Sequence, residues 1–94
     1  MSQTFNVLIV AEFKDITEDA YKEICLRLEE HCLEKISTLE SAWEFKVEAG
    51  DESEAKDKTL HEFNQVCCTY RFECALLVHA GIGQILRRRK RYQG

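Results

Sequence analysis

The strongest chemical signal in the sequence is a run of consecutive cations near its C-terminal end. The residues of this basic tail are Arg87, Arg88, Arg89, Lys90 and Arg91, followed by Tyr92. Adjacent cations neutralise phosphates and release counterions, which gives salt-dependent affinity without sequence preference. An aromatic ring beside them can stack on a base. The tail therefore predicts a contact with nucleic acid or with an acidic protein surface, and a solvated terminus is the alternative interpretation.

A second candidate surface consists of acidic side chains between residues 44 and 57. Its members are Glu44, Glu48, Asp51, Glu52, Glu54 and Asp57. Carboxylates gathered on one surface steer a basic partner surface toward it. We interpret this acidic region and the basic tail as the two candidate binding surfaces of the chain.

Cysteine and histidine are frequent enough to suggest metal or thiol chemistry. The chain has five cysteines and three histidines, but no Cys-x-x-Cys pair. The neighbours Cys67 and Cys68 point about 100° apart on a helix and to opposite faces of a strand, which disfavours their convergence on one tetrahedral metal. An odd number of cysteines without a secretion signal indicates reduced thiols packed as small hydrophobic residues. We expect no metal, no cofactor and no catalytic residue.

Two glycines near the end of the chain raise the question of a phosphate-binding turn. Gly81 and Gly83 follow an apolar stretch, but Leu86 stands where the dinucleotide fingerprint has its third glycine. A Gly-Lys-Ser/Thr sequence is absent as well. Glycine is also the default residue of ordinary turns, which is the interpretation we favour. A small enzyme that uses His79 or a cysteine as its reactive group is the least favoured alternative.

The charges divide the chain into two unequal parts. Residues 1–86 carry 8 Lys+Arg and 17 Asp+Glu, a net charge of −9, whereas residues 87–94 carry +5 and bring the total to −4. We predict one acidic domain over residues 1–86 and a basic tail over residues 87–94, since 94 residues hold only one core. The chain has no long apolar stretch and no basic region before its first apolar run. These features favour a cytoplasmic protein.

The first half of the chain predicts a strand and a long helix. Residues 5–13 alternate and are rich in β-branched side chains, which indicates a strand, and its second face is also apolar in the middle. Asp15 is expected to cap a helix over residues 16–37, with Glu18 as its reciprocal partner. Leu26 and Leu33 lie away from the main apolar stripe of this helix. We interpret them as surface leucines, with a helix–helix contact as the alternative.

The second half predicts two more strands around a shorter helix. Residues 42–49 alternate cleanly, which indicates a strand with one face toward solvent. Residues 60–72 fit either a helix or a strand. We expect a helix over residues 53–68, a strand over residues 71–79 and a turn over residues 80–83. Residues 84–92 fit either a short helix or a return strand.

Together these elements predict an α+β domain in the order β-α-β-α-β, folded as a two-layer sandwich with a short basic C-terminal element. We expect three strands in one sheet under two helices, and homodimerisation through the bare sheet face or an edge. The strand, long helix and alternating strand over residues 5–49 resemble the opening of dimeric α+β-barrel and ferredoxin-like proteins.

The sequence thus favours a small non-catalytic interaction protein, a regulator, inhibitor or adaptor of the kind that phages also encode, which binds a macromolecular partner with a basic surface. Binding of nucleic acid through residues 87–92 is the alternative, and a small α+β-barrel-type enzyme is the second alternative. Nothing in the sequence indicates a membrane partner.

Overall fold

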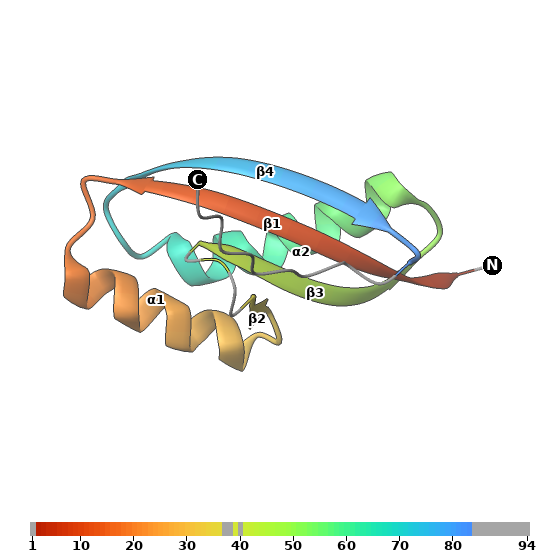
Figure 1. The fold of residues 1–94 in the computed structure, drawn as a ribbon, viewed down its shortest axis with the longest axis horizontal. Helices are drawn as coiled ribbons and strands as arrows, with labels where there is room; N and C mark the ends of the chain where they lie inside the picture. Colours follow the sequence, from red (N-terminus) through yellow and green to blue (C-terminus); the bar gives the residue numbers. More distant parts are fainter. Residues whose placement is uncertain (1, 37–38, 40, 84–94) are drawn as a thin grey trace, which may run out of the picture.

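The computed structural model describes residues 2–36, 39 and 41–83 and contains four strands and two helices among them (Figure 1). The elements are β1 (Gln3–Lys14), α1 (Glu18–Glu30), β2 (Glu34–Lys35), β3 (Ala42–Ala49), α2 (Glu52–Cys67) and β4 (Glu73–Gly81). The predicted α+β sandwich is confirmed, with one strand more than expected. The helix or return strand predicted over residues 84–92 lies outside the described residues.

The strands form one antiparallel sheet in the order β2-β3-β1-β4, so β1 lies at its centre. The chain makes two βαβ units, β1-α1-β2 and β3-α2-β4. In the sheet, β3 lies between β1 and β2, and β1 lies between β3 and β4. This is the split βαβ arrangement of ferredoxin-like proteins. The strand order agrees with the ferredoxin-like part of the resemblance, and a shared topology does not by itself imply a function.

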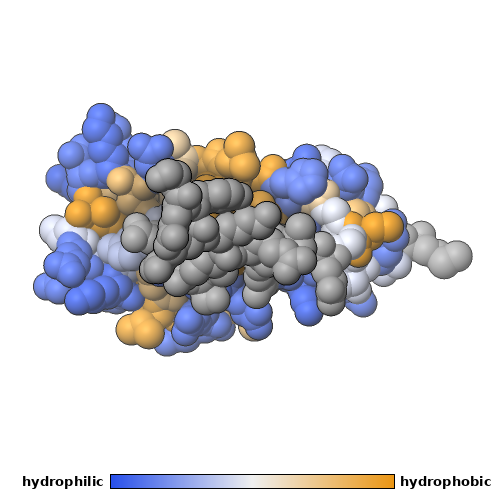
Figure 2. Space-filling model, viewed as in Figure 1, coloured by the Kyte–Doolittle hydropathy of each residue, from blue (hydrophilic) through white to orange (hydrophobic). Residues whose placement is uncertain are grey.

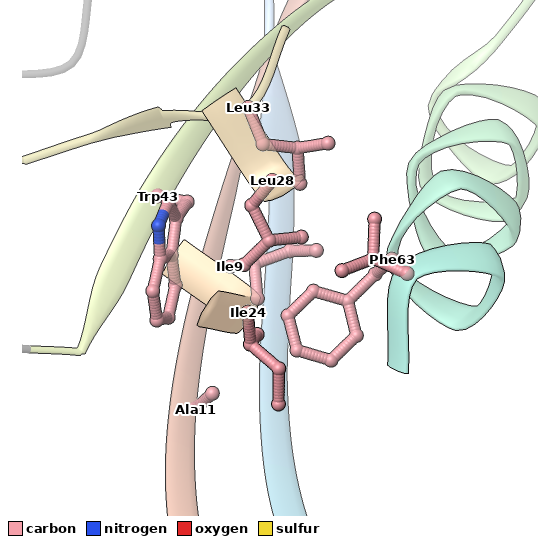
Figure 3. Packing of buried hydrophobic residues seen from close by; sticks show 8 residues of the cluster. Ile9, Ala11, Ile24, Leu28, Leu33, Trp43 and Phe63 are labelled. Atoms are coloured by element: carbon pink, nitrogen blue, oxygen red, sulfur yellow. The ribbon is translucent and has the colours of Figure 1, made fainter. Parts of the chain in front are cut away.

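Both helices pack on one face of this sheet, and the main core lies between the two layers (Figure 1). Alternate side chains of β1 are buried on this face, as the alternation over residues 5–13 predicted. Figure 3 shows how Ile9 of β1 and Trp43 of β3 meet Phe63 of α2 and the α1 residues Ile24 and Leu28. The rings of Trp43 and Phe63 are 6.3 Å apart between centroids. This packing fixes α2 against the sheet, where the helix contacts β3, β4 and β1.

The end of α1 differs from the prediction, because the helix stops at Glu30 and not at residue 37. Cys32 adopts a φ of 69°, and its N–H donates to the Glu29 carbonyl at 3.0 Å. The Leu33 N–H donates to the Leu28 carbonyl at 2.9 Å. These two hydrogen bonds form a Schellman cap, which turns the chain back and frees the next residues to form β2.

The Schellman cap also explains the two leucines. Leu33 is fully buried and packs in the same cluster as Leu28, so its interpretation as a surface residue was wrong. A hydrophobic contact between these two positions commonly accompanies the cap. Leu26, which stays on the helix surface, is exposed as expected.

The start of α1 also requires a correction. Thr17 is the N-cap, since its side-chain oxygen accepts the Ala20 N–H at 3.2 Å. Asp15, the predicted cap, lies in the preceding link with a φ of 61°. Aspartate tolerates this left-handed conformation better than most residues, which lets it make the sharp turn out of β1.

The remaining elements deviate from their predicted bounds by one or two residues. α2 begins after the N-cap Asp51 and ends at Cys67, and β3 has the predicted bounds. β4 covers Glu73–Gly81 instead of residues 71–79, so Ala80 and Gly81 belong to the strand and not to a turn. The reason is the length of β1, whose Val7 and Asn6 still pair with Ala80 and Gly81.

Candidate interaction groove

An open groove of about 610 Å³ runs between the N-terminal half of α2 and strand β4. It is lined by Asp51, Glu52, Ser53, Lys56, Asp57 and Leu60 from the start of α2 together with Val78 of β4. The strand and the helix are held side by side by the core beneath them, so the groove is a fixed feature of the fold.

The groove combines an apolar floor with an acidic rim. Leu60 and Val78 are half-buried and supply the floor. Three exposed carboxylates, those of Asp51, Glu52 and Asp57, lie on the rim, and Lys56 is the one cation among the lining residues. Such a combination suits a ligand that brings both hydrophobic and positively charged groups.

The position of these acids follows from helix chemistry. Asp51 caps α2, and its side-chain oxygen accepts the Glu54 N–H at 2.8 Å. Carboxylates near a helix N-terminus are stabilised by the positive end of the helix dipole, with about 0.3–1 kcal/mol each at exposed sites. Asp51 and Glu52 therefore hold a negative charge beside the groove at little cost to the fold.

The acidic residues predicted to act together are divided by the structure. Asp51, Glu52 and Asp57 meet at the groove. Glu54 instead forms an ion pair with Lys58, with the two charged atoms 3.1 Å apart, and also accepts a hydrogen bond from the Gly50 N–H. The hydrogen bond from Lys58 lowers the pKa of Glu54 below its ordinary value.

Glu44 and Glu48 lie on β3, on the sheet face opposite the helices. Glu48 is exposed, but Glu44 is buried, so the prediction that this face of β3 is open to solvent throughout was wrong. The unpredicted strand β2 pairs with β3 at this point and places Glu34 directly across from Glu44. β3 is therefore an inner strand, with Leu8 of β1 on its other side.

Strand β4 forms one edge of the sheet, a feature that sequence reasoning did not identify (Figure 1). Its nine residues contain no proline, lysine or arginine. Leu76 and Leu77 are 38% and 63% exposed, and Figure 2 shows apolar surface where Figure 1 places β4. Among the described residues, no strand pairs with the outer side of β4. The opposite edge is β2, which has only two residues.

The cysteines and histidines do not form a reactive cluster in the described part of the chain. No group of three metal-binding side chains occurs there, and all five cysteines are free thiols. Burial raises the pKa of the Cys67 thiol to about 11 and also raises the pKa of Cys74. A raised pKa opposes thiolate formation at neutral pH, which nucleophilic cysteine chemistry requires.

The histidines occupy separate places. His79 is exposed on the sheet face away from the helices, across from Leu8. His31 follows α1, and its Nδ1 lies 2.9 Å from the Glu62 Oε2 of α2. The contact between His31 and Glu62 ties the end of α1 to α2 and is a structural link between the helices.

The predicted binding residues of the basic tail, Arg87 to Arg91 and Tyr92, lie outside the described residues. No helix within residues 2–36 and 41–83 is long and apolar enough to cross a membrane.

Comparison with known proteins gives no match to a family model, to a curated protein or to a solved structure.

Proposed function

We propose that this protein is a non-catalytic interaction protein that binds a partner carrying a basic surface, and that the groove between α2 and β4 is the binding site. The observation that carries this proposal is the acidic rim of Asp51, Glu52 and Asp57 around the apolar floor of Leu60 and Val78.

Two physical effects support a basic partner. Residues 1–86 carry a net charge of −9, which accelerates the approach of a positively charged surface and repels an anionic one. At the groove, the apolar floor then supplies the desolvated contact from which most binding energy comes. Regulators and inhibitors that act by occupying another protein's basic surface need both properties.

Direct nucleic-acid binding through residues 87–92 is the second candidate, favoured by the five consecutive cations of the tail. The acidic body opposes it, because the net charge of −9 over residues 1–86 repels the phosphate backbone. The two candidates place the binding site on different parts of the chain, so they can be separated.

The test is a pull-down of the full chain from lysate of its source cells after nuclease treatment, read by mass spectrometry. The decisive comparison uses the double variant Glu52→Lys/Asp57→Lys, which reverses the rim without removing the Asp51 cap. A matched control, Glu29→Lys/Glu30→Lys, makes the same change of charge on the exposed surface of α1.

We expect the wild type and the α1 control to retain a partner after nuclease and the groove variant to lose it. Thermal unfolding of all three proteins checks that the fold is kept. A partner retained equally by the groove variant would contradict the proposal. Recovery that disappears with nuclease would assign the binding to nucleic acid instead.

A further inference from the structure

Building on the proposed function, we infer that the partner contributes an extended segment that pairs with the outer edge of β4 as an added strand and lays its basic side chains into the groove, with their aliphatic stems on the apolar floor. The partner segment is a β-strand in which Lys or Arg alternates with a hydrophobic residue.

The outer edge of β4 pairs with no strand among the described residues. A sheet edge presents a row of backbone N–H and C=O groups that can template another chain. Proteins usually protect such edges with short strands, lysines or prolines. β2 follows this rule with two residues, whereas β4 has nine residues and none of these protective residues. Its one charged residue is Glu73, at the start of the strand.

The groove lies beside this edge of the sheet. The groove is formed by α2 on one side and β4 on the other, with Val78 contributing from the strand itself. A strand added beside β4 would direct every second side chain toward the helix layer, and so into the groove. Recognition by strand addition combines backbone hydrogen bonds with side-chain pockets in the same way.

The acidic rim of the groove favours positively charged side chains. Those directed into the groove meet the carboxylates of Asp51, Glu52 and Asp57 above the floor of Leu60 and Val78. An Arg or Lys side chain buries its aliphatic stem on such a floor while its charged end reaches the rim. An acidic segment would be repelled, so the rim also supplies selectivity.

A second copy of this chain fits the edge less well. Antiparallel pairing of two β4 strands about Leu77 would set Val78 across from the partner copy's Leu76. The two acidic grooves, each beginning at Val78, would then face each other across the new seam. Like charges placed across a strand pair are destabilising. The charge of the groove thus favours a basic segment from another protein.

The experiment uses the full chain and the blocked peptide Arg-Val-Arg-Val-Arg-Val-Arg, with binding followed by fluorescence anisotropy and by amide hydrogen exchange. Two further peptides carry N-methyl groups, one on the arginine amides and one on the valine amides. They keep the charge and side chains of the parent, but each removes the donors along one edge of the extended peptide. Glu52→Lys/Asp57→Lys and Glu29→Lys/Glu30→Lys serve as the groove variant and its control.

We expect the parent peptide to bind and to slow hydrogen exchange at those amides of residues 73–81 that point away from β1. One of the methylated peptides should lose at least about tenfold in affinity while the other still binds, because only one edge of the added strand meets β4. Equal binding of all three peptides, still sensitive to the groove variant, would overturn strand addition and leave the proposed function standing.

Two other outcomes also overturn the inference. Binding that is insensitive to the groove variant would remove both the inference and the proposed function. Slow exchange before any peptide is added at those amides of residues 73–81 that point away from β1, with no peptide binding, would show that the edge is already occupied. Sedimentation of the free chain then decides between a second copy and the chain's own residues 84–94.

Discussion

At the scale of single residues, Leu26 and Leu33 show how far the sequence pattern reaches. Seven residues apart, they have the same spacing relative to the apolar stripe of α1, yet one is exposed and the other is fully buried. The difference comes from backbone geometry, because the helix ends between them and Leu33 is carried back onto the core. A helical periodicity cannot predict burial beyond the residue where the helix stops.

The two leucines therefore predict different mutational costs. Leu33→Ala should lower the free energy of unfolding by about 2–5 kcal/mol, since it removes a fully buried side chain from a packed cluster. Leu26→Ala should change it by less than about 0.5 kcal/mol, as surface substitutions do. Urea unfolding followed by circular dichroism measures both. Equal losses for the two variants would contradict the described burial.

The cysteines should differ in reactivity according to their burial. Burial raises the pKa of Cys67 to about 11, so only about 0.1% of this thiol is ionised at pH 8. Cys32 and Cys68 are exposed. Alkylation of the native chain with iodoacetamide at pH 8, read by peptide mass spectrometry, should modify these two first and Cys67 at least about tenfold more slowly.

The same reaction in guanidinium chloride supplies the control, because all five thiols should then react at similar rates. A native Cys67 that reacts as fast as Cys32 would disprove the raised pKa. It would also reopen the least favoured interpretation, that of an enzyme with a reactive cysteine.

At the scale of elements, the strands and α2 could be predicted because their signals are local. The alternation of residues 42–49 gives β3 its observed bounds, and the apolar helix face that includes Leu60 and Val66 predicts α2 to within one residue at each end. The two-residue strand β2 carries no such signal, and its residues fall inside the pattern that predicted a longer helix. The stop of α1 was missed because its left-handed residue is Cys32, where a glycine would have marked the end.

This cap leads to a prediction about stability. A non-glycine residue in the left-handed region costs about 1–2 kcal/mol, and Cys32 is exposed, so its side chain contributes little packing. Cys32→Gly should therefore raise the free energy of unfolding by about 1 kcal/mol. The control Glu30→Gly, two residues earlier at the last helical position of α1, should lower it by about as much. A loss of stability in Cys32→Gly would show that the chain does not turn at this residue.

At the scale of the whole molecule, the candidate site could be predicted only in part. The sequence identified the acids around residues 51–57, because a charge cluster is visible without a fold. It could not identify the groove, since Val78 reaches Leu60 only through the order of strands in the sheet. For the same reason, the sequence grouped Glu44 and Glu48 with the acids of the groove. In the fold, these two residues lie on the sheet face opposite the helices, away from the groove.

The homodimer expected from the sequence is a property of the whole molecule, and it stays a prediction. The sheet face opposite the helices carries Leu77, which is 63% exposed, beside Val10 of β1. If two copies associate through this face, Leu77→Lys should shift sedimentation toward the monomer. Leu26→Lys changes an equally exposed leucine on α1 and should leave the dimer intact. A wild-type chain that is monomeric at every concentration would rule out the homodimer.

The central claim is that a basic partner segment binds between α2 and β4, and amide chemical shifts test it most directly. The ¹⁵N-labelled full chain is titrated with the Arg-Val peptide at low salt. We predict that the largest shift changes occur over residues 51–60 and 73–81, with little change along α1, and that Glu52→Lys/Asp57→Lys abolishes them. Changes centred on α1 or on the opposite sheet face, or a chain that does not respond, would contradict the account.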